Sequence, residues 1–226
     1  MDFEAARHEM VVRQLRGRGI RSDRVLNAMD SVPRHLFVPP EKIPSAYADE
    51  PLAIGERQTI SQPFMVATMA DALLLTGTER LLEVGGGSGY QAAVLSLLVR
   101  KVIAVESQSV LAVSARERLA RLGYSNVRVE EGDGSMGWPL GAPYDAILVT
   151  AAAPSVPPPL FDQLVEGGRL VIPVGSMDKQ ELIRIVKREG RPAQQSLLAC
   201  QFVPLLGRFG WQATPRKSSA GDESHA

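Results

Sequence analysis

A glycine-rich turn directly after a short apolar run places the strongest constraint on the fold of this 226-residue chain. Residues 81–84 read Leu-Leu-Glu-Val, and glycine follows at positions 85, 87 and 89, where a helix over 89–99 is expected to begin. Glycine permits a tight turn and the close approach of a ligand, and the N-terminus of the helix offers free N–H groups. The pattern predicts a strand, turn and helix that hold a nucleotide-like cofactor over the strand end, with a ligand-free turn as the alternative.

The spacing of these glycines separates cofactor classes. A dinucleotide-binding turn would carry glycine at position 90, where this chain has Tyr90. The observed Gly-x-Gly-x-Gly spacing therefore favours S-adenosyl-L-methionine, with S-adenosyl-L-homocysteine as its product, over nicotinamide or flavin. The residues expected to contact the cofactor at this turn are Glu83, Gly85, Gly87, Ser88 and Gly89.

Apolar runs and helical segments alternate from residue 80 onward, which predicts an α/β fold. The runs that read as strands are 81–84, 102–105, 127–129, 145–149, 170–174 and 181–186. The helical segments between the early strands are 89–99, 109–122 and 157–166. This alternation is typical of a doubly wound, mainly parallel sheet covered on both faces, and such sheets bind ligands at the carboxyl ends of their strands.

The first 76 residues lack this alternation. Apolar residues recur at helical spacing over the first 40, Ser22 is a suitable N-cap, and Pro63 falls at the first turn of another expected helix. Residues 41–61 are expected to be loop. The predicted division is a helical and substrate-loop segment (1–76), a cofactor-binding core (77–211) and a disordered tail (212–226).

The composition argues against several classes of partner. Lys plus Arg and Asp plus Glu both number 25, so no net field favours nucleic acid or an acidic membrane. The single cysteine, Cys200, excludes an internal disulfide and a multi-cysteine zinc site, and the three histidines show no metal-ligand spacing. With no signal-peptide pattern and no membrane-length apolar run, we expect a cytoplasmic monomer that binds no metal, nucleic acid or membrane.

Acidic residues follow two further strands and suggest partners for a nucleoside. Glu106 follows the strand 102–105, where a carboxylate can accept from both ribose hydroxyls, although a solvated strand-end charge is the alternative. Asp133 lies between two glycines after the strand 127–129 and could accept from the adenine amine or stabilise its own turn. The residues expected at this end of the cofactor are Glu106, Ser107, Asp133 and Gly134.

The fourth strand ends in small residues, which restricts the chemistry of the methyl acceptor. Residues 150–154 read Thr-Ala-Ala-Ala-Pro and lack the Asn/Asp-Pro-Pro-aromatic pattern common among enzymes that methylate nitrogen. They also lack the cysteine that cytosine C5 enzymes require. Small residues supply no base, which suits an acceptor already nucleophilic at neutral pH, such as a carboxylate.

Six motifs, in order along the chain, resemble those of one enzyme family. They are Val32-Pro-Arg-His-Leu-Phe-Val-Pro, Gln58-Thr-Ile-Ser-Gln-Pro, Leu82-Glu-Val-Gly-Gly-Gly-Ser-Gly-Tyr-Gln-Ala-Ala-Val-Leu, Tyr144-Asp-Ala-Ile-Leu-Val-Thr-Ala-Ala, Glu166-Gly-Gly-Arg-Leu-Val-Ile-Pro-Val-Gly and Phe202-Val-Pro-Leu. From about Met10 to about Leu206 the chain resembles the protein-L-isoaspartate (D-aspartate) O-methyltransferases. The resemblance implies a Rossmann-like class I methyltransferase with a seven-stranded sheet and an N-terminal helical segment.

The resemblance also implies a reaction and a catalytic residue. The methyl group of S-adenosylmethionine passes to the α-carboxylate of L-isoaspartyl and D-aspartyl residues in damaged peptides and proteins, and the ester cyclises to a succinimide that hydrolyses partly to normal aspartate. The serine of Thr-Ile-Ser, treated as catalytic in the family, is Ser61 here. Its loop is expected to lie against the cofactor through Gln58, Thr59, Ile60 and Ser61.

Other interpretations stay open at the level of sequence. The chain could methylate a small free carboxylate, or it could bind the cofactor without catalysis. Ser61 could serve as an N-cap for the helix after Pro63. Two residues also depart from the family pattern: Arg57 replaces a usual glycine, and Gly86 replaces a common threonine.

Overall fold

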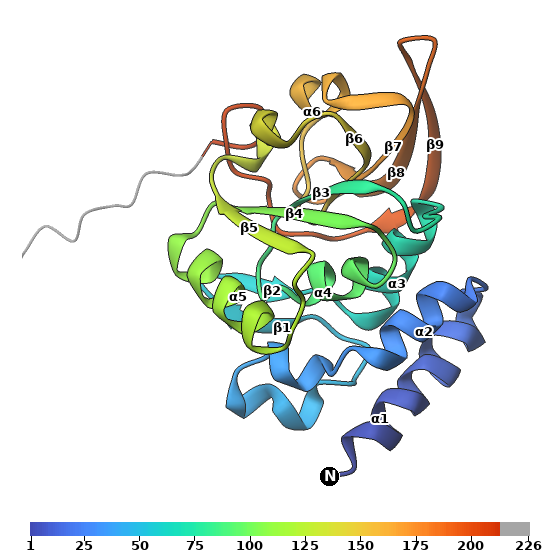
Figure 1. The fold of residues 1–226 in the computed structure, drawn as a ribbon, viewed down its shortest axis with the longest axis vertical. Coiled ribbons are helices and arrows are strands. Elements are labelled where there is room, and N and C mark those ends of the chain that lie inside the picture. Colours follow the sequence, from blue (N-terminus) through green and yellow to red (C-terminus); the bar gives the residue numbers. More distant parts are fainter. Residues whose placement is uncertain (213–226) are drawn as a thin grey trace, which may run out of the picture.

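A seven-stranded sheet forms the centre of the molecule in the computed structural model, which describes residues 1–212. The strand order is β5-β4-β3-β6-β7-β8-β9 (Figure 1). Pairing is parallel from β5 to β7, and β8 and β9 are antiparallel to their neighbours. The predicted doubly wound, mainly parallel seven-stranded sheet is confirmed. The strands are β3 (Arg80–Val84), β4 (Lys101–Glu106), β5 (Val127–Glu131), β6 (Tyr144–Val149), β7 (Leu164–Gly175), β8 (Gln180–Arg188) and β9 (Arg191–Cys200).

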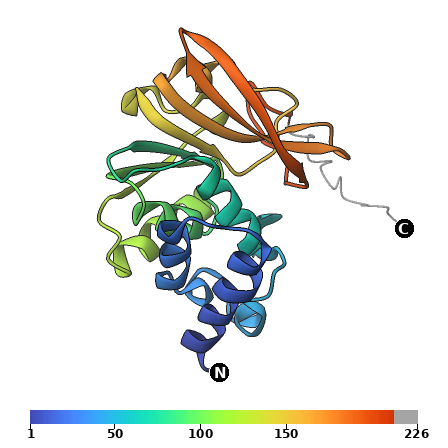
Figure 2. The same ribbon diagram turned by 90° about the vertical axis from the view of Figure 1, so that its right-hand side faces the viewer.

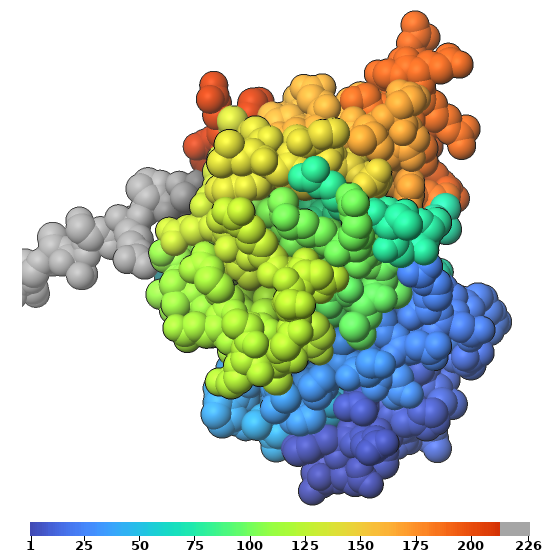
Figure 3. Space-filling model, viewed as in Figure 1, coloured from blue at the N-terminus to red at the C-terminus, as the bar shows by residue number. Residues whose placement is uncertain are grey.

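Helices cover both faces of the sheet, and the N-terminal segment forms one end of the molecule (Figures 2 and 3, blue). Among the described residues, no helix combines the length and the apolar character needed to cross a bilayer. The α-helices are α1 (Phe3–Glu9), α2 (Asp23–Ser31), α3 (Pro63–Ala72), α4 (Tyr90–Ser96), α5 (Ser109–Arg121) and α6 (Pro158–Asp162). A π-helical turn (Met10–Leu15) continues α1, and short 3-10 turns are Arg16–Arg18, Arg34–Phe37, Pro40–Ser45, Gly134–Met136 and Pro139–Gly141.

Neighbouring residues of the central strands enter two different hydrophobic clusters, one on each face of the sheet. Leu81 and Leu148 belong to the cluster that includes residues of α2, α3, α4 and α5. Their neighbours Leu82 and Ile147 belong to the other cluster, with Leu160 of α6. Because both faces are covered, the strands read as continuous apolar runs.

The segment 41–61, expected to be loop, contains a β-hairpin. Strand β1 (Leu52–Gly55) pairs antiparallel with β2 (Gln58–Ile60). The turn consists of Glu56 and Arg57, whose φ angles of 48° and 58° are left-handed. Two-residue turns of this kind normally carry Asn-Gly or Asp-Gly, so the usual sequence signal of a hairpin is missing.

We expect Arg57→Gly to raise the free energy of unfolding by about 0.5–1 kcal/mol, because glycine adopts a left-handed φ without steric strain. Arg57→Ala is the matched control, since it removes the same charge but keeps a Cβ in the strained conformation. Urea unfolding of both variants measures the effect. Equal stability of the two variants would show that the turn is not strained.

One other boundary differs from prediction, and one strand lies where no apolar run was identified. The helix expected over 157–166 is the short α6, and β7 already begins at Leu164, so this strand carries the Gly167–Gly168 pair within it. Strand β9 includes residues 191–196, which are exposed and have no apolar pattern. Of the predicted disordered tail, residues 213–226 lie outside the described part of the chain.

Glu79 fixes the connection between α3 and β3. Its carboxylate accepts hydrogen bonds from the Thr76 and Gly77 amides, both at 2.8 Å, and pairs with Arg169 at 3.1 Å. Burial alone would raise its pKa, but the hydrogen bonds from Thr76 and Gly77 outweigh burial and lower the pKa from 4.5 to about 2.

Ionised Glu79 therefore stabilises the folded state above pH 4.5, and this contribution is lost as the pH falls toward 2. We expect Glu79→Gln to be less stable than the wild type near neutral pH and to lose less stability on acidification. Urea unfolding at several pH values between about 6 and 3 measures this slope. Parallel stability curves for the two proteins would contradict it.

Candidate active site

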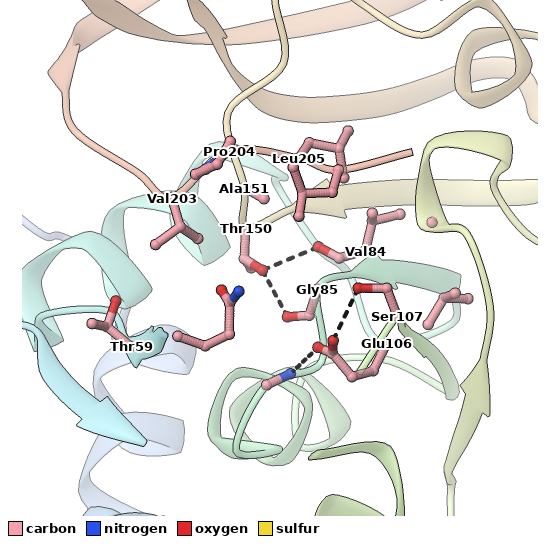
Figure 4. A pocket seen from close by; sticks show the side chains of 15 residues that line it. Thr59, Val84, Gly85, Glu106, Ser107, Thr150, Ala151, Val203, Pro204 and Leu205 are labelled. Atoms are coloured by element: carbon pink, nitrogen blue, oxygen red, sulfur yellow. Dashed lines mark hydrogen bonds between the residues drawn. The ribbon is translucent and has the colours of Figure 1, made fainter. Parts of the chain in front are cut away.

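The turn after β3 is held in place by Thr150 at the end of β6. The Thr150 hydroxyl lies 3.0 Å from the Val84 carbonyl oxygen and 2.7 Å from that of Gly85, so it can donate to either (Figure 4). Gly85 has a φ of 94°, and a Cβ built on it would lie 2.4 Å from the Thr150 hydroxyl oxygen. This position of the turn therefore accepts no side chain. The turn and Thr150 line a cleft at the carboxyl ends of the strands, which is here called the main cleft because most of the predicted cofactor residues lie on it.

The buried carboxylate of Glu106 lies beneath the same turn. One oxygen accepts from the Gly87 amide at 2.8 Å (Figure 4), and the other accepts from the Gln108 amide at 2.8 Å. Ser107 lies beside it, with its hydroxyl 3.4 Å from Glu106 Oε1. Glu106 thus joins the glycine turn to the start of α5 while lining the main cleft. Each carboxylate oxygen retains capacity to accept from a ribose hydroxyl.

Asp133 is engaged by its own turn and by the C-terminal segment. One oxygen accepts from the amide and hydroxyl of Ser135 at 2.9 and 2.6 Å, and the other accepts from the Arg208 amide at 2.7 Å. These contacts agree with the alternative that Asp133 stabilises its turn. Its neighbour Gly134 lines the main cleft. An adenine amine would have to use the remaining lone pairs of this carboxylate.

A second pocket, here called the inner pocket, is lined by the glycine turn, Glu83 and Gln91 and contains unpaired polar groups. Both carboxyl oxygens of Glu83 and the Nε2 of Gln91 are buried without a hydrogen-bond partner among the described residues. Burial raises the pKa of Glu83 well above its ordinary value, and the nearby Glu106 carboxylate raises it further. Unpaired buried groups are costly, so they indicate that a polar ligand completes this pocket. Ser88 and Tyr90 also line the pocket, and Gly89 is the N-cap of α4.

Ser61 lines both the inner pocket and a third pocket, here called the outer pocket. It lines the inner pocket with Glu83 and the outer pocket with Met65 and Phe202. Gln62, not Ser61, occupies the N-cap position of α3, and no side chain of this segment caps the helix. Within residues 1–212, the Ser61 hydroxyl makes no hydrogen bond, so it is available to a ligand.

The rest of the predicted loop lies on the same cleft. Gln58 and Thr59 line the main cleft, and Thr59 and Ile60 line the inner pocket. The structure therefore brings the residues from β2 and the glycine turn together, although they are distant in sequence. Thr150 and Gln91 were not identified from the sequence. Gln91 follows the informative Tyr90 directly, but nothing in the pattern shows that it points inward.

The segment after β9 closes one side of the cleft, which the sequence also did not reveal. Val203, Pro204 and Leu205 line the main cleft opposite the glycine turn (Figure 4). This segment is attached to the residues after β6. The Ala152 amide donates to the Val203 carbonyl at 2.8 Å, and the Ala152 carbonyl accepts from the Leu205 amide at 2.8 Å and from Trp211 Nε1 at 3.1 Å.

Comparison with known proteins decides the family. The sequence model of the protein-L-isoaspartate(D-aspartate) O-methyltransferases matches residues 6–210. The chain belongs to this family. The protein-L-isoaspartate O-methyltransferase of Methanoculleus marisnigri is 55% identical over 206 residues, which cover 91% of this chain and 94% of that protein. A second one, from Geotalea uraniireducens, is 52% identical over 212 residues, covering 93% and 98%.

Solved structures of the protein-L-isoaspartate O-methyltransferase family share the fold. One matches with a TM-score of 0.82 and 32% identity, covering 90% of this chain and 67% of that chain. A β-aspartate methyltransferase from Plasmodium falciparum, in complex with S-adenosyl-L-homocysteine, matches with a TM-score of 0.75 and 27% identity, covering 88% and 98%. The family expected from the six motifs is confirmed.

The cleft suits the cofactor of a protein-L-isoaspartate O-methyltransferase. The glycine turn has no side chains at positions 85 to 87, where the nucleoside of the cofactor would lie against the backbone. The inner pocket contains the unpaired Glu83 and Gln91, which could bind the amino-acid end of the cofactor. Within the described residues, no group of three or more His, Cys, Asp or Glu side chains is arranged to hold a metal ion.

Proposed function

We propose that Ser61 is the residue that orients the methyl acceptor, at the junction of the inner and outer pockets. The enzyme is an S-adenosylmethionine-dependent protein carboxyl O-methyltransferase that acts on L-isoaspartyl and D-aspartyl residues of damaged peptides and proteins. The methyl ester it forms is attacked by the following backbone nitrogen, which releases methanol and gives a succinimide. The observation that carries the proposal is the free Ser61 hydroxyl, which lines both the inner pocket and the outer pocket.

The residues divide between binding the cofactor and orienting the acceptor. When bound, S-adenosylmethionine supplies a methyl group on a positively charged sulfur. Glu83 would hold the ammonium group of its amino-acid end, Glu106 and Ser107 its ribose, and Asp133 and Gly134 its adenine. The side chains of Gln58, Thr59 and Ile60, with Gly85, Gly87, Ser88 and Gly89, would complete the binding surface.

Little further chemistry is needed from the protein. A carboxylate is ionised at neutral pH, so it requires no base to become nucleophilic. The task of Ser61 is to donate a hydrogen bond to one carboxylate oxygen so that the other points along the line of transfer. The neighbouring Thr150 and the strand-end alanines leave room for the acceptor without competing for protons.

The wider organisation also remains a proposal. Residues 1–76 would present the substrate to the core of residues 77–211, and the enzyme would act as a monomer in the cytoplasm without nucleic-acid or membrane partners. The balanced charge, 25 cationic and 25 anionic residues, supports the last point.

The deciding experiment compares two peptides that differ only in an aspartyl or isoaspartyl linkage. Transfer of labelled methyl to the isoaspartyl peptide alone is expected. Equal transfer to both peptides, or none to either, would overturn the proposal. A free dicarboxylic acid as a third acceptor tests the alternative of a small-carboxylate methyltransferase, and binding of S-adenosylhomocysteine without any turnover would support a non-catalytic module.

A further inference from the structure

The first turn of α3 depends on an acceptor from another part of the chain. The opening N–H groups of a helix have no partner within it, and the side chain of the N-cap residue Gln62 caps none of them. The missing acceptor is Asp49, whose Oδ1 receives the Phe64 amide at 3.0 Å. Asp49 was not identified from the sequence, because it precedes the helix by a whole hairpin.

Asp49 belongs to a four-residue cluster, here called the Asp49 clasp, formed by Arg18, Asp49, Gln62 and Phe64. Its Oδ2 pairs with Arg18 Nη1 and lies 3.5 Å from Gln62 Nε2. The Arg18 guanidinium also lies over the Phe64 ring, 3.6 Å from its centroid. The clasp therefore connects the turn Arg16–Arg18 to the two residues on either side of Pro63.

The segment that carries Asp49 is itself anchored. The Tyr47 carbonyl accepts from Gln14 Nε2 at 2.8 Å, and the Ala46 carbonyl accepts from Nε of the fully buried Arg34 at 2.7 Å. Asp49 thus follows a segment that is held against the turns Met10–Leu15 and Arg34–Phe37. Because the Phe64 amide donates to Asp49, the start of α3 is held relative to this anchored segment.

Ser61 lies in the short connection between two fixed points. Strand β2 ends at Ile60 and α3 begins at Pro63, so only Ser61 and Gln62 join them. On one side the hairpin holds Ile60 through its pairing with Leu52. On the other side the Asp49 clasp holds Gln62 and Phe64.

We propose that Asp49 is a positioning residue that acts through Ser61, by fixing the start of α3 so that the serine hydroxyl points to the methyl acceptor. This inference rests on the catalytic role proposed for Ser61. A small misplacement of a positioning group can cost about 100-fold in rate. We expect Asp49→Ala to lower kcat on the isoaspartyl peptide by about 10- to 100-fold while the Kd of S-adenosylhomocysteine changes less than about twofold.

The conservative variant separates positioning from loss of the fold. Asp49→Asn keeps an oxygen acceptor for the Phe64 amide but removes the charge that pairs with Arg18. It is expected to recover most of the kcat lost in Asp49→Ala. Asp30→Ala is the matched control, since Asp30 on α2 pairs with Arg7 and His8 of α1, and the kcat of this variant should not change. An Asp49→Asn variant as slow as Asp49→Ala would overturn the proposal.

A double-mutant cycle tests whether the effect passes through Ser61. In a Ser61→Ala background, Asp49→Ala should lower kcat by less than about twofold, because coupled sites are not additive. A full 10- to 100-fold further loss would overturn the proposal. Amide hydrogen exchange at Phe64 should accelerate in Asp49→Ala, and it can be measured whether or not the protein methylates a peptide. Faster exchange in Asp49→Ala, together with a wild type that does not methylate isoaspartate, would refute the function while leaving the clasp intact. Unchanged exchange in Asp49→Ala would refute the clasp.

Discussion

Ser61→Ala is expected to lower methyl transfer to an isoaspartyl peptide by about 10- to 150-fold. The variant loses one hydrogen bond to a charged group, worth about 1.5–3 kcal/mol, and this energy converts to that factor in rate. The loss should fall mainly on kcat, because an ionised carboxylate still enters the outer pocket without the hydroxyl. The measurement is steady-state transfer of labelled methyl at saturating cofactor.

The control is a serine whose hydroxyl is already used. The Ser31 hydroxyl donates to the Asn27 carbonyl at 2.7 Å on α2, so Ser31→Ala should leave turnover unchanged. If Ser61→Ala turned over as fast as Ser31→Ala, Ser61 would have no part in the mechanism. The Ser61 hydroxyl does not cap α3, so the stability of Ser61→Ala should change little. A change in its rate can therefore be assigned to the reaction.

The sequence was sufficient for the centre of the fold because burial is periodic there. Leu81 and Leu82 face opposite clusters, and both must be apolar in a sheet covered on two sides. The hairpin β1–β2 and the strand β9 carry no such pattern. The hairpin turns through left-handed Glu56 and Arg57 without the expected glycine. The first six residues of β9 are exposed, so backbone pairing rather than burial defines that part of the strand.

The candidate site was predicted where each residue stands next to a strand end. Glu106 and the glycine turn lie on the cleft as expected, because their place in the sequence fixes their place in a parallel sheet. The hydrogen bonds that Glu106 and Asp133 make to backbone amides depend on turn geometry, which the sequence pattern does not specify. Thr150 and Asp49 bond to residues far away in sequence, and Gln91 lines a pocket with such residues, so single-sequence periodicity contains no information about these positions.

Two adjacent glycines should respond in opposite ways to the same substitution. A Cβ on Gly85 would lie 2.4 Å from the Thr150 hydroxyl oxygen, at a backbone φ of 94°. A Cβ on Gly86 would meet only Ala104 Cβ at 3.6 Å and Glu106 Cβ at 3.7 Å, which are ordinary contacts. The family pattern agrees, since a threonine is common at the position of Gly86.

We expect Gly85→Ala to cost about 2–5 kcal/mol, from a left-handed residue with a side chain and from overpacking against Thr150. Gly86→Ala should instead be neutral or stabilise the fold by up to about 1 kcal/mol, because alanine restricts the unfolded chain. Calorimetric titration with S-adenosylhomocysteine and urea unfolding measure both effects. Equal affinity and stability of the two variants would refute the role of the turn.

The clash at Gly85 can be tested separately from the backbone strain. Thr150→Ala removes the hydroxyl that a Cβ on Gly85 would strike, so Gly85→Ala should cost less in that background than in the wild type. The remaining cost would then come from the φ of 94° alone, about 1–2 kcal/mol. An undiminished cost would mean that Thr150 moves aside freely and that the backbone conformation, rather than the hydroxyl, excludes every residue except glycine from the cofactor turn.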